Sequence, residues 1–490
     1  SLFSSTNLQS TEDLVPFAAM ERGSHEQAHD VAVVVVPLPA QSHLAQLLHL
    51  SLLLCGRPGV SVHYATSRTH IRQAKSRLHP AWGSGSVSQI RFHELPIPAF
   101  PSPPPDLNSA STKFPAHFQP MFDVFEHLRT PLSTLLRSLS TSSHRVVVVH
   151  DSLSSFVAAE AAALHNVESY TFHCVPALFQ LVLCLPSVAD ELRDGGLSLP
   201  PLDGIFTEEF GVFARRQLTE ATAGAGTLFN TCRPIEGVFI DLVAREPEHR
   251  DRKLFTVGPL SPMALLLNGG GLRQPHECLD WLDKQAPASV VYVSFGTTTS
   301  MSEEQVKELA NGLLRSGQRF IWVLRDADRA DIFTAEDNGN PRRMKLPPEL
   351  EHKVEGTGMV VRGWAPQLEI LAHPSMGAFM SHCGWNSCME SLCMGVPMIA
   401  WPMHSDQPTN AALVTEHLKV GVTVREWTPR GDEVVGRSDI EEAIKRVMVY
   451  EEGRATRARA RVLGEAVRAA AAEGGASRAE FDAFVAHITR

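Results

Sequence analysis

Short, unbroken apolar runs alternate along this chain with longer segments of helical periodicity. The runs at residues 31–36 and 146–149 are almost pure valine. A strand that is apolar on both faces is typical of a parallel sheet with helices packed on each side. Similar runs predict further strands at residues 60–65, 168–175, 226–231, 290–296, 319–324, 377–381 and 396–401. Helical segments separate most of these strands, which is the alternation of doubly wound α/β folds.

Polar residues and glycines mark where several of the helices begin and end. Ser42 is placed to cap a helix that runs to about Leu54, with Gly56 as its stop. Ser302 and Gln305 have the spacing of a capping box for the helix that follows them. Helical spacing also extends over residues 114–139, 409–418, 438–448, 454–472 and 480–488.

The helix after the predicted strand at 377–381 has the clearest boundary signals. Asn386 or Ser387 can cap it, and Glu390, three residues beyond Ser387, adds capping-box spacing. Gly395 suits the C-terminal end of that helix. With the strand that follows, this stretch predicts a right-handed strand–helix–strand unit whose helix begins at the carboxyl end of a strand.

Such a helix start is a ready site for phosphate, because free backbone N–H groups and the positive end of the helix dipole point at it. His382, Asn386 and Ser387 add side-chain donors, and Trp364 offers a flat face for a base. Three residues are candidate acceptors for sugar hydroxyls: Glu390, Asp406 and Gln407. Together these features indicate a nucleotide-sugar site.

Other roles stay open for some of these residues. Glu390 can serve only as a capping-box carboxylate, a role that is compatible with sugar binding. Trp385 and Trp401 can belong to the core. Three cysteines are spaced C-x4-C-x4-C, which is not a usual zinc spacing, so we interpret them as buried free thiols: Cys383, Cys388 and Cys393.

The stretch resembles the signature box of plant secondary-product UDP-glycosyltransferases over 44 residues. The matching positions include Trp364-Ala-Pro-Gln367, His373, Gly377, His382-Cys-Gly-Trp-Asn-Ser387, Glu390, Gly395-Val-Pro397 and Asp406-Gln407. In that family the tryptophan stacks on uracil, the histidine and the Asn-Ser pair hold the diphosphate, and the glutamate binds the ribose. The final Asp-Gln pair holds the sugar hydroxyls, and its glutamine is associated with glucose.

The resemblance therefore implies a donor site for UDP-glucose. Its candidate residues are Ser294, Thr297, Trp364, Ala365, Gln367, His382, Gly384, Trp385, Asn386, Ser387, Glu390, Asp406 and Gln407.

His43 falls in the first turn of the helix after the first strand, at the ligand-binding edge of an open α/β sheet. There the helix dipole disfavours the imidazolium, and a neutral imidazole suits a general base. A lone histidine at a helix end can equally have no role. However, Pro37-x-Pro39-x-Gln41-x-His43 resembles the loop that holds the family's catalytic histidine. The chain departs from that family at Ser42, usually glycine, and at Gln46, proline in many members.

Asp151 follows the valine run 146–149 and should reach the same edge. A carboxylate there can fix the tautomer of His43 and stabilise the imidazolium that forms on proton transfer. The family has an aspartate after the equivalent strand. Two alternatives are that Asp151 caps the next helix and that His150 is the partner of His43.

Composition limits the class of protein. The 490 residues suffice for two or three domains, and 43% hydrophobic with 20% charged residues is ordinary for a soluble globular protein. A net charge of −10 argues against a nucleic-acid partner. The eight cysteines form no disulfide framework, which indicates the cytoplasm. No apolar run reaches the roughly 18 residues of a membrane helix.

Two irregular segments carry motifs of other protein classes. Gly269-Gly-Gly271 lacks the spacing of a dinucleotide fingerprint, so we interpret it as linker. Asp326-Ala-Asp328 resembles the metal site of a different glycosyltransferase fold. We interpret this pair as part of a solvated, charged loop and expect no metal or other cofactor.

The family resemblance covers residues 31–490 and implies two doubly wound, Rossmann-like domains that face a cleft, the GT-B fold. The expected divisions are a non-native or disordered leader (1–27), an acceptor-binding domain (28–257), a linker (258–275), a UDP-sugar-binding domain (276–472) and a C-terminal helix that returns to the first domain (473–490).

The predicted function is that of a cytoplasmic, monomeric, inverting O-glucosyltransferase that uses UDP-glucose. Residues 168–173 and 319–329, among others, resemble zeatin O-glucosyltransferases in particular, which implies a cytokinin hydroxyl as acceptor, with the cis isomer of zeatin as one candidate. The alternatives are a flavonoid or other phenolic acceptor with O- or C-glucosylation, and a non-catalytic nucleotide-sugar-binding protein. The presence of both His43 and Asp151 argues against the last.

Overall fold

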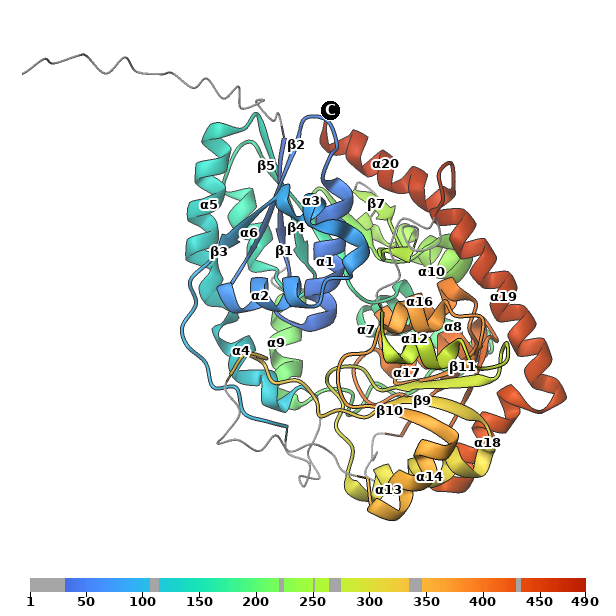
Figure 1. The fold of residues 1–490 in the computed structure, drawn as a ribbon. Coiled ribbons are helices and arrows are strands. Elements are labelled where there is room, and N and C mark those ends of the chain that lie inside the picture. Colours follow the sequence, from blue (N-terminus) through green and yellow to red (C-terminus); the bar gives the residue numbers. More distant parts are fainter. Residues whose placement is uncertain are drawn as a thin grey trace, which may run out of the picture.

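The computed structural model describes residues 31–105, 114–219, 224–249, 252–263, 275–334, 346–428 and 433–490. The predicted leader (1–27) and the glycine triplet of the predicted linker lie outside these ranges. Within them, the chain forms two parallel β-sheets with helices on both faces (Figure 1).

The first sheet has seven strands in the order β3-β2-β1-β4-β5-β6-β7. They are β1 (Val31–Val36), β2 (Val60–Thr66), β3 (Ile90–Glu94), β4 (Arg145–Asp151), β5 (Val167–His173), β6 (Gly226–Phe229) and β7 (Lys253–Thr256). Successive residues of β1 pack into different hydrophobic clusters, Val33 on one face of the sheet and Val34 on the other. Both faces are therefore buried, which explains why β1 is apolar throughout.

The second sheet has six strands in the order β10-β9-β8-β11-β12-β13. They are β8 (Val290–Ser294), β9 (Arg319–Val323), β10 (Gly358–Val361), β11 (Met376–Ser381), β12 (Met398–Ala400) and β13 (Gly421–Thr423). The sequence missed the strands at the two ends of each sheet: β3, β7, β10 and β13. Edge strands are short and partly exposed, so they lack the continuous apolar run that marked the central strands.

Helices cover both faces of each sheet. Around the first sheet they are α1 (Gln41–Leu54), α2 (Arg68–Ser76), η1 (Pro80–Trp82), α3 (Gly83–Ser88), η2 (Ala116–Phe118), α4 (Gln119–Phe125), η3 (Glu126–Leu128), α5 (Arg129–Ser142), α6 (Phe156–Ala162), α7 (Ala177–Cys184), α8 (Pro186–Asp194), α9 (Glu208–Thr219), α10 (Arg233–Arg245) and η4 (Pro247–His249). The later ones are α12 (Glu277–Leu282), α13 (Glu303–Ser316), α14 (Pro348–Thr357), α15 (Gln367–Leu371), α16 (Trp385–Met394), α17 (Gln407–Ala412), η6 (Leu413–His417), α18 (Arg437–Met448), α19 (Glu451–Ala471) and α20 (Ala476–Ile488).

The last two helices connect the two halves of the molecule. Figure 1 shows α19 and α20, in red, running along one side from the second sheet to the first. Phe484 and Ile488 of α20 are fully buried in the cluster that contains Val33 of β1. The end of the chain therefore stabilises the first half of the molecule by burying apolar surface there.

The predicted start of α13 and the predicted end of α16 are confirmed, and the predicted cap of α1 is wrong. Ser302 caps α13, because its hydroxyl accepts the Gln305 N–H at 3.2 Å, although the Gln305 side chain bonds elsewhere. Gly395 ends α16 at φ +71°, a conformation that glycine adopts without strain. α1 begins at Gln41 after Ala40, so Ser42 is not its cap.

The segment after β9 differs from the solvated loop that the sequence predicted. Asp328 is 9% exposed and Ala330 1% exposed. Ala330 packs into the cluster on the Val34 face of the first sheet. The segment therefore crosses from the second sheet to the first, a contact between distant parts of the chain that a charged local composition does not reveal.

Candidate active site

The predicted catalytic residues lie at the point where the strand order of the first sheet reverses. β1 and β4 are adjacent parallel strands, with Val36 opposite His150. His43 is in the first turn of α1, directly after β1, and Asp151 is the last residue of β4. In open α/β sheets, the crevice beyond the carboxyl ends of two such strands is the usual ligand site.

His43 and Asp151 form a direct pair. His43 Nδ1 lies 2.6 Å from Asp151 Oδ2, and the Asp151 side chain is fully buried while that of His43 is 17% exposed. An ionised carboxylate only accepts hydrogen bonds, so Nδ1 carries the proton and donates it. The Nε2 lone pair is therefore left available as a base.

Two further donors hold Asp151. The Leu153 N–H donates to Oδ1 at 2.9 Å, and the Cys174 thiol donates to Oδ2 at 3.3 Å. The side chains of His43, Asp151 and Cys174 could in principle ligate a metal, because their ligand atoms all lie within 4.8 Å of one another. The hydrogen bonds among the three residues account for this short separation. The alternative that Asp151 caps the next helix is not supported, because α6 has no side-chain cap.

The charges of nearby carboxylates determine the direction in which the pKa of His43 shifts. Burial lowers the pKa of His43, but the charge and hydrogen bond of Asp151, with a further contribution from Asp406, raise it above 6.5. Burial raises the pKa of Asp151, but His43 and the other donors outweigh burial and lower it. The pKa of His43 therefore shifts upward, opposite to the direction that the helix dipole predicts, because the carboxylate of Asp151 contacts the ring directly.

The predicted phosphate-binding turn lies at the corresponding point of the second sheet. Ser381, the last residue of β11, is paired with Ser294, the last residue of β8, and the strand order reverses between these two strands. Cys383 has φ +65°, and α16 then begins after Gly384. Backbone strain of this kind is concentrated at functional sites.

Two glycines surround the His382 ring. A Cβ on Gly384 would lie 2.4 Å from His382 Nε2, and one on Gly296 would lie 2.5 Å from it. Only glycine leaves room for the imidazole at both positions. Burial lowers the pKa of His382 to about 4, against an opposing hydrogen bond with the Ser294 backbone. The ring is therefore neutral at pH 7.

The predicted cap of α16 is wrong: neither Asn386 nor Ser387 caps it, and Gly384 precedes the helix without a side-chain bond. The N–H groups of the first turn are consequently not used by a cap. Ser387 and Glu390 instead share a partner, because Gln367 Nε2 donates to Ser387 Oγ at 3.0 Å and to Glu390 Oε2 at 2.8 Å. Burial raises the pKa of Glu390 to about 7.

Asp406 and Gln407 lie at the start of α17. Burial raises the pKa of Asp406 to about 6, and its Oδ2 accepts from Asn410 Nδ2 at 2.7 Å. Gln407 is 3% exposed, and its Oε1 accepts the Met403 and His404 N–H groups at 2.9 and 3.1 Å. The charge of Asp406 raises the pKa of His43. The predicted sugar-binding carboxylate of Asp406 is therefore close enough to the predicted base for its charge to act on it.

The remaining candidates differ in exposure. Trp364 is 53% exposed, as a stacking platform requires, and Ala365 beside it is buried. Ser294 is also buried, whereas Thr297 lies in the loop after β8, where its carbonyl accepts the Asp328 N–H at 2.7 Å. Trp385 is buried in the core, as the alternative interpretation allowed, and its side chain points away from solvent.

Hydrogen bonds join the two sheet edges. Asn386 Nδ2 lies 3.4 Å from the carbonyl oxygen of Ser42, the residue before His43. The Trp385 indole N–H donates to the carbonyl of Asn230 at 2.8 Å. The start of α16 and the start of α1 therefore face each other across the space between the sheets.

Sequence reasoning missed the residues that support this arrangement. Gln46 Nε2 donates to the Cys174 carbonyl at 3.0 Å, and its Oε1 accepts from Asn230 Nδ2 at 2.8 Å. Gln46 and Asn230 are 1% and 2% exposed. Gln46 lies one turn after His43. A polar residue among the apolar positions of α1 was a signal in the sequence that could have pointed to its role. Nothing in the sequence singled out Cys174 or Asn230.

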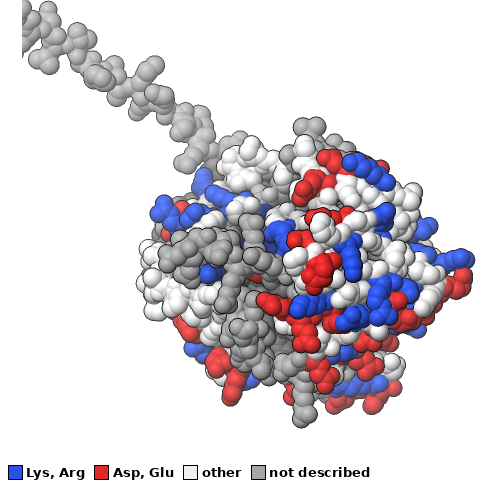
Figure 2. All heavy atoms as spheres, turned by 60° about the horizontal axis from the view of Figure 1, so that its bottom comes forward, with Lys and Arg blue, Asp and Glu red and all other residues white. Residues whose placement is uncertain are grey.

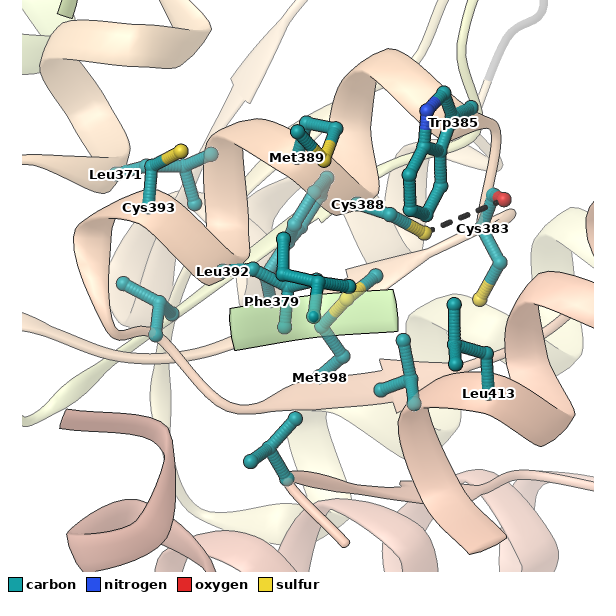
Figure 3. Close-up of a cluster of buried hydrophobic side chains, with 14 of the residues drawn as sticks. Leu371, Phe379, Cys383, Trp385, Cys388, Met389, Leu392, Cys393, Met398 and Leu413 are labelled. Carbon is teal, nitrogen blue, oxygen red and sulfur yellow. Dashed lines mark hydrogen bonds between the residues drawn. The ribbon is translucent and has the colours of Figure 1, made fainter. Parts of the chain in front are cut away.

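The three cysteines near α16 are buried free thiols, as predicted. Figure 3 shows them among apolar side chains such as Phe379 and Leu392, with the Cys388 thiol directed at the Cys383 carbonyl, 3.4 Å away. Burial raises the pKa of Cys388 and Cys393 well above 9. These thiols therefore pack as small apolar groups.

Charged residues of both signs share the described part of the face in Figure 2. Figure 2 shows basic and acidic side chains interspersed over the face that it views, without the broad basic stripe that nucleic-acid binding requires. Among the described helices, none has the length and apolar character needed to cross a membrane.

Comparison with known proteins agrees with this geometry. Residues 29–262 match the family described as glycosyltransferase, N-terminal domain, and residues 260–453 match the one described as UDP-glucoronosyl and UDP-glucosyl transferase. Cis-zeatin O-glucosyltransferase 2 of Zea mays is 49% identical over 94% of this chain and 98% of its own. Zeatin O-xylosyltransferase of Phaseolus vulgaris is 45% identical, with the same coverage of 94% and 98%.

The solved structures that match have the same architecture. The crystal structure of a UGT transferase from Siraitia grosvenorii in complex with UDP is 28% identical, covers 94% of this chain and 100% of its own, and has a TM-score of 0.72. The predicted sites lie at the facing edges of the two sheets, and the relatives match over almost their whole length. The chain belongs to the UDP-glycosyltransferase family and has its two-domain GT-B fold.

Proposed function

We propose that this protein is an inverting O-glucosyltransferase that transfers glucose from UDP-glucose to a hydroxyl group of a cytokinin of the zeatin type. The observation that carries the chemistry is the His43–Asp151 pair, 2.6 Å apart, opposite the start of α16. The acceptor rests on the relatives that are named for zeatin. The runner-up is a phenolic acceptor of the flavonoid type.

In the proposed mechanism, His43 Nε2 takes the proton of the acceptor hydroxyl. The acceptor oxygen then bonds to the anomeric carbon from the face opposite UDP, and the bond between that carbon and the diphosphate oxygen breaks. Asp151 stabilises the imidazolium that forms. The start of α16, with His382, Asn386 and Ser387, stabilises the charge that develops on the leaving diphosphate, so no metal is required.

We further propose roles for the two halves of the chain. Residues 28–257 would bind the acceptor and residues 276–472 the donor, with a linker (258–275) between them and the C-terminal helix (473–490) returning to the first. Trp364 would stack on the uracil, and Glu390 would accept from the ribose. Asp406 and Gln407 would hold the sugar, for which Gln407 must exchange its bonds to the Met403 and His404 N–H groups for bonds to hydroxyls. The free cysteines fit a cytoplasmic protein, and we expect a monomer.

The acceptor assignment is tested with cis-zeatin, trans-zeatin and several flavonols, each with UDP-glucose or UDP-xylose. We expect one zeatin isomer with UDP-glucose to be converted fastest, to a product that acid hydrolyses. Conversion of flavonols alone would remove the cytokinin assignment, and an acid-stable product would indicate C-glucosylation. A preference for UDP-xylose would correct the donor sugar. UDP binding without any turnover would favour a binding protein.

Donor binding should weaken as the pH falls through the pKa of Glu390. Only the ionised carboxylate can accept hydrogen bonds from both its neighbour Gln367 and the ribose without donating one itself. With a pKa of about 7, the ionised fraction, and with it the affinity, should fall about tenfold between pH 8 and pH 6. The measurement is the KM for UDP-glucose across this range.

The Glu390→Gln variant should remove this pH dependence, because its amide oxygen still accepts from Gln367 but does not titrate. Asp406→Asn serves as the comparison, since Asp406 is another carboxyl of the proposed donor site whose pKa burial raises, to about 6. If Asp406→Asn flattens the profile and Glu390→Gln does not, the titrating group has been misassigned.

A further inference from the structure

The segment after β9 joins the two halves of the molecule beside the donor site. We call residues 325–334 the strap. Its Ala330 is 1% exposed in the cluster formed by side chains of β1, α4 and α9. The Asp331 N–H donates to Ser102 Oγ at 2.9 Å, and the Arg72 guanidinium lies 4.1 Å from the centre of the Phe333 ring. The strap therefore extends from the second sheet and packs on the first.

Asp328 bonds to both halves of the molecule through its side chain and its backbone. Its Oδ2 lies 2.5 Å from Arg77 Nη1, and its other carboxylate oxygen accepts from Arg325. Its carbonyl accepts from His117 Nε2 at 3.0 Å, and its N–H donates to the Thr297 carbonyl. The side chains of Arg77 and Asp328 are only 10% and 7% exposed, so water and salt screen the pair little. One carboxylate thus binds an arginine from each half of the molecule.

Both arginines face Trp364. The guanidinium carbons of Arg77 and Arg325 lie 4.9 and 5.8 Å from the centre of the indole, within the range of cation–π attraction. A cavity of about 340 Å³ opens beside them, lined by Ser76, Arg77, Arg325, Arg362, Gly363 and Trp364. Ser76 and Arg77 come from the end of α2 in the first half of the chain, and the other residues come from the second half. Neither half forms this cavity alone.

We propose that Asp328 and Arg77 are positioning residues for the sugar donor: they hold the two domains together at Trp364 and so complete the pocket for the nucleotide base. This inference rests on the proposed UDP-sugar donor. A planar guanidinium that is already fixed by a carboxylate does not have to be ordered when the nucleotide enters. Loss of either residue lets the first domain move away from Trp364, and the base then binds a half-formed pocket.

A purely structural strap would behave differently. If the ion pair only supported the fold, breaking it would lower the amount of active enzyme, and with it the apparent kcat, without changing the affinity for the donor. A positioning role raises the Kd for UDP and the KM for UDP-glucose, while kcat at saturating donor is retained. The split between KM and kcat therefore separates the two roles.

The test compares Arg77→Met, Asp328→Asn and the double variant with wild type. Removing one partner of a charge-assisted bond should raise the Kd for UDP, measured by calorimetry, about tenfold. The KM for UDP-glucose should rise in parallel, and kcat should change less than about twofold. The Kd of the double variant for UDP should be no higher than that of the single variant with the higher Kd, because both substitutions remove the same interaction. Arg77→Lys should recover part of the affinity for UDP, since lysine keeps the positive charge but lacks the planar guanidinium with its several N–H donors.

Arg233→Met is the matched control. Arg233 pairs with Asp241 at 3.1 Å, but their side chains are 55% and 51% exposed, so its loss should leave donor affinity unchanged. Unchanged UDP affinity in Arg77→Met and Asp328→Asn, in an otherwise active enzyme, overturns the inference, and so does a fall in kcat alone. A wild-type protein that does not bind UDP overturns the proposed function instead. If Asp328→Asn does not fold, Arg77→Met decides the question.

Discussion

Replacing His43 with alanine is expected to lower kcat for glucosyl transfer by about 10²- to 10⁴-fold, the range that a positioned general base contributes. The ring of His43 has a fixed orientation, because Asp151 Oδ2 lies 2.6 Å from Nδ1, and its Nε2 lone pair is available. The acceptor hydroxyl would otherwise have to attack with its proton in place. The measurement is kcat with UDP-glucose and the preferred acceptor.

Donor affinity should survive this substitution, since the proposed UDP contacts lie on the second sheet. The Kd for UDP should change less than about twofold, which shows that the variant is folded. His352→Ala is the control for losing a histidine, because His352 is 92% exposed on α14. Undiminished transfer by His43→Ala would refute the assignment of the base. A parallel loss of UDP binding would point to misfolding instead.

Asp151→Asn is expected to cost nearly as much, about 10³-fold or more in kcat, through the tautomer of His43. The Leu153 N–H donates to Oδ1 at 2.9 Å, and this backbone donor requires an oxygen at that position. The amide nitrogen of the variant must then take the place of Oδ2 and donate to His43 Nδ1. That moves the ring proton to Nε2, the atom that has to accept the proton of the substrate.

The pH profile separates this effect from a general loss of structure. In the wild type, Asp151 holds the pKa of His43 above 6.5 despite burial. A base is active only when unprotonated, so kcat/KM for the acceptor should rise with pH through a value above 6.5. In Asp151→Asn the residual activity should rise at lower pH, because burial then acts on His43 without the opposing charge.

Asp190→Asn is the matched control for Asp151→Asn. Asp190 is 72% exposed on α8 and pairs with Arg193, so its amide variant should keep both the rate and the profile of the wild type. An Asp151→Asn enzyme with wild-type kcat would show that the pair does not set the tautomer. If the acid side of the pH profile does not shift in Asp151→Asn, a group other than His43 titrates in that pH range.

These two predictions connect to the hydrogen bonds behind the pair. Gln46, one turn after His43, and Asn230, after β6, bond to each other, and Asn230 accepts from the indole of Trp385. The helix that carries the proposed base and the helix that faces the proposed diphosphate therefore rest on one buried amide pair. Fully bonded buried networks of this kind hold their members in a single arrangement.

Much of the fold was readable from the sequence because it depends on local pattern. Central strands such as β1 and β8 are buried on both faces, so each is a continuous apolar run bounded by turns. The edge strands escaped detection because one side of each has no partner strand. Cap residues were predicted correctly where the cap is a local hydrogen bond, as at Ser302. They failed at α1 and α16, where a short loop joins the strand to the helix and no side chain caps it.

The candidate site divides in the same way. The sequence alone determined the strand–helix turn at 381–386, the histidine after β1 and the aspartate that ends β4, because each depends on residues a few positions apart. Only the tertiary structure decided that Asp151 contacts His43, that Asp406 raises its pKa, and that Asp328 is buried against Arg77. These contacts join residues from different strands, and Asp328 and Arg77 lie in different halves of the chain. Burial and pairing at that range follow from packing, which no local pattern of charge or hydrophobicity encodes.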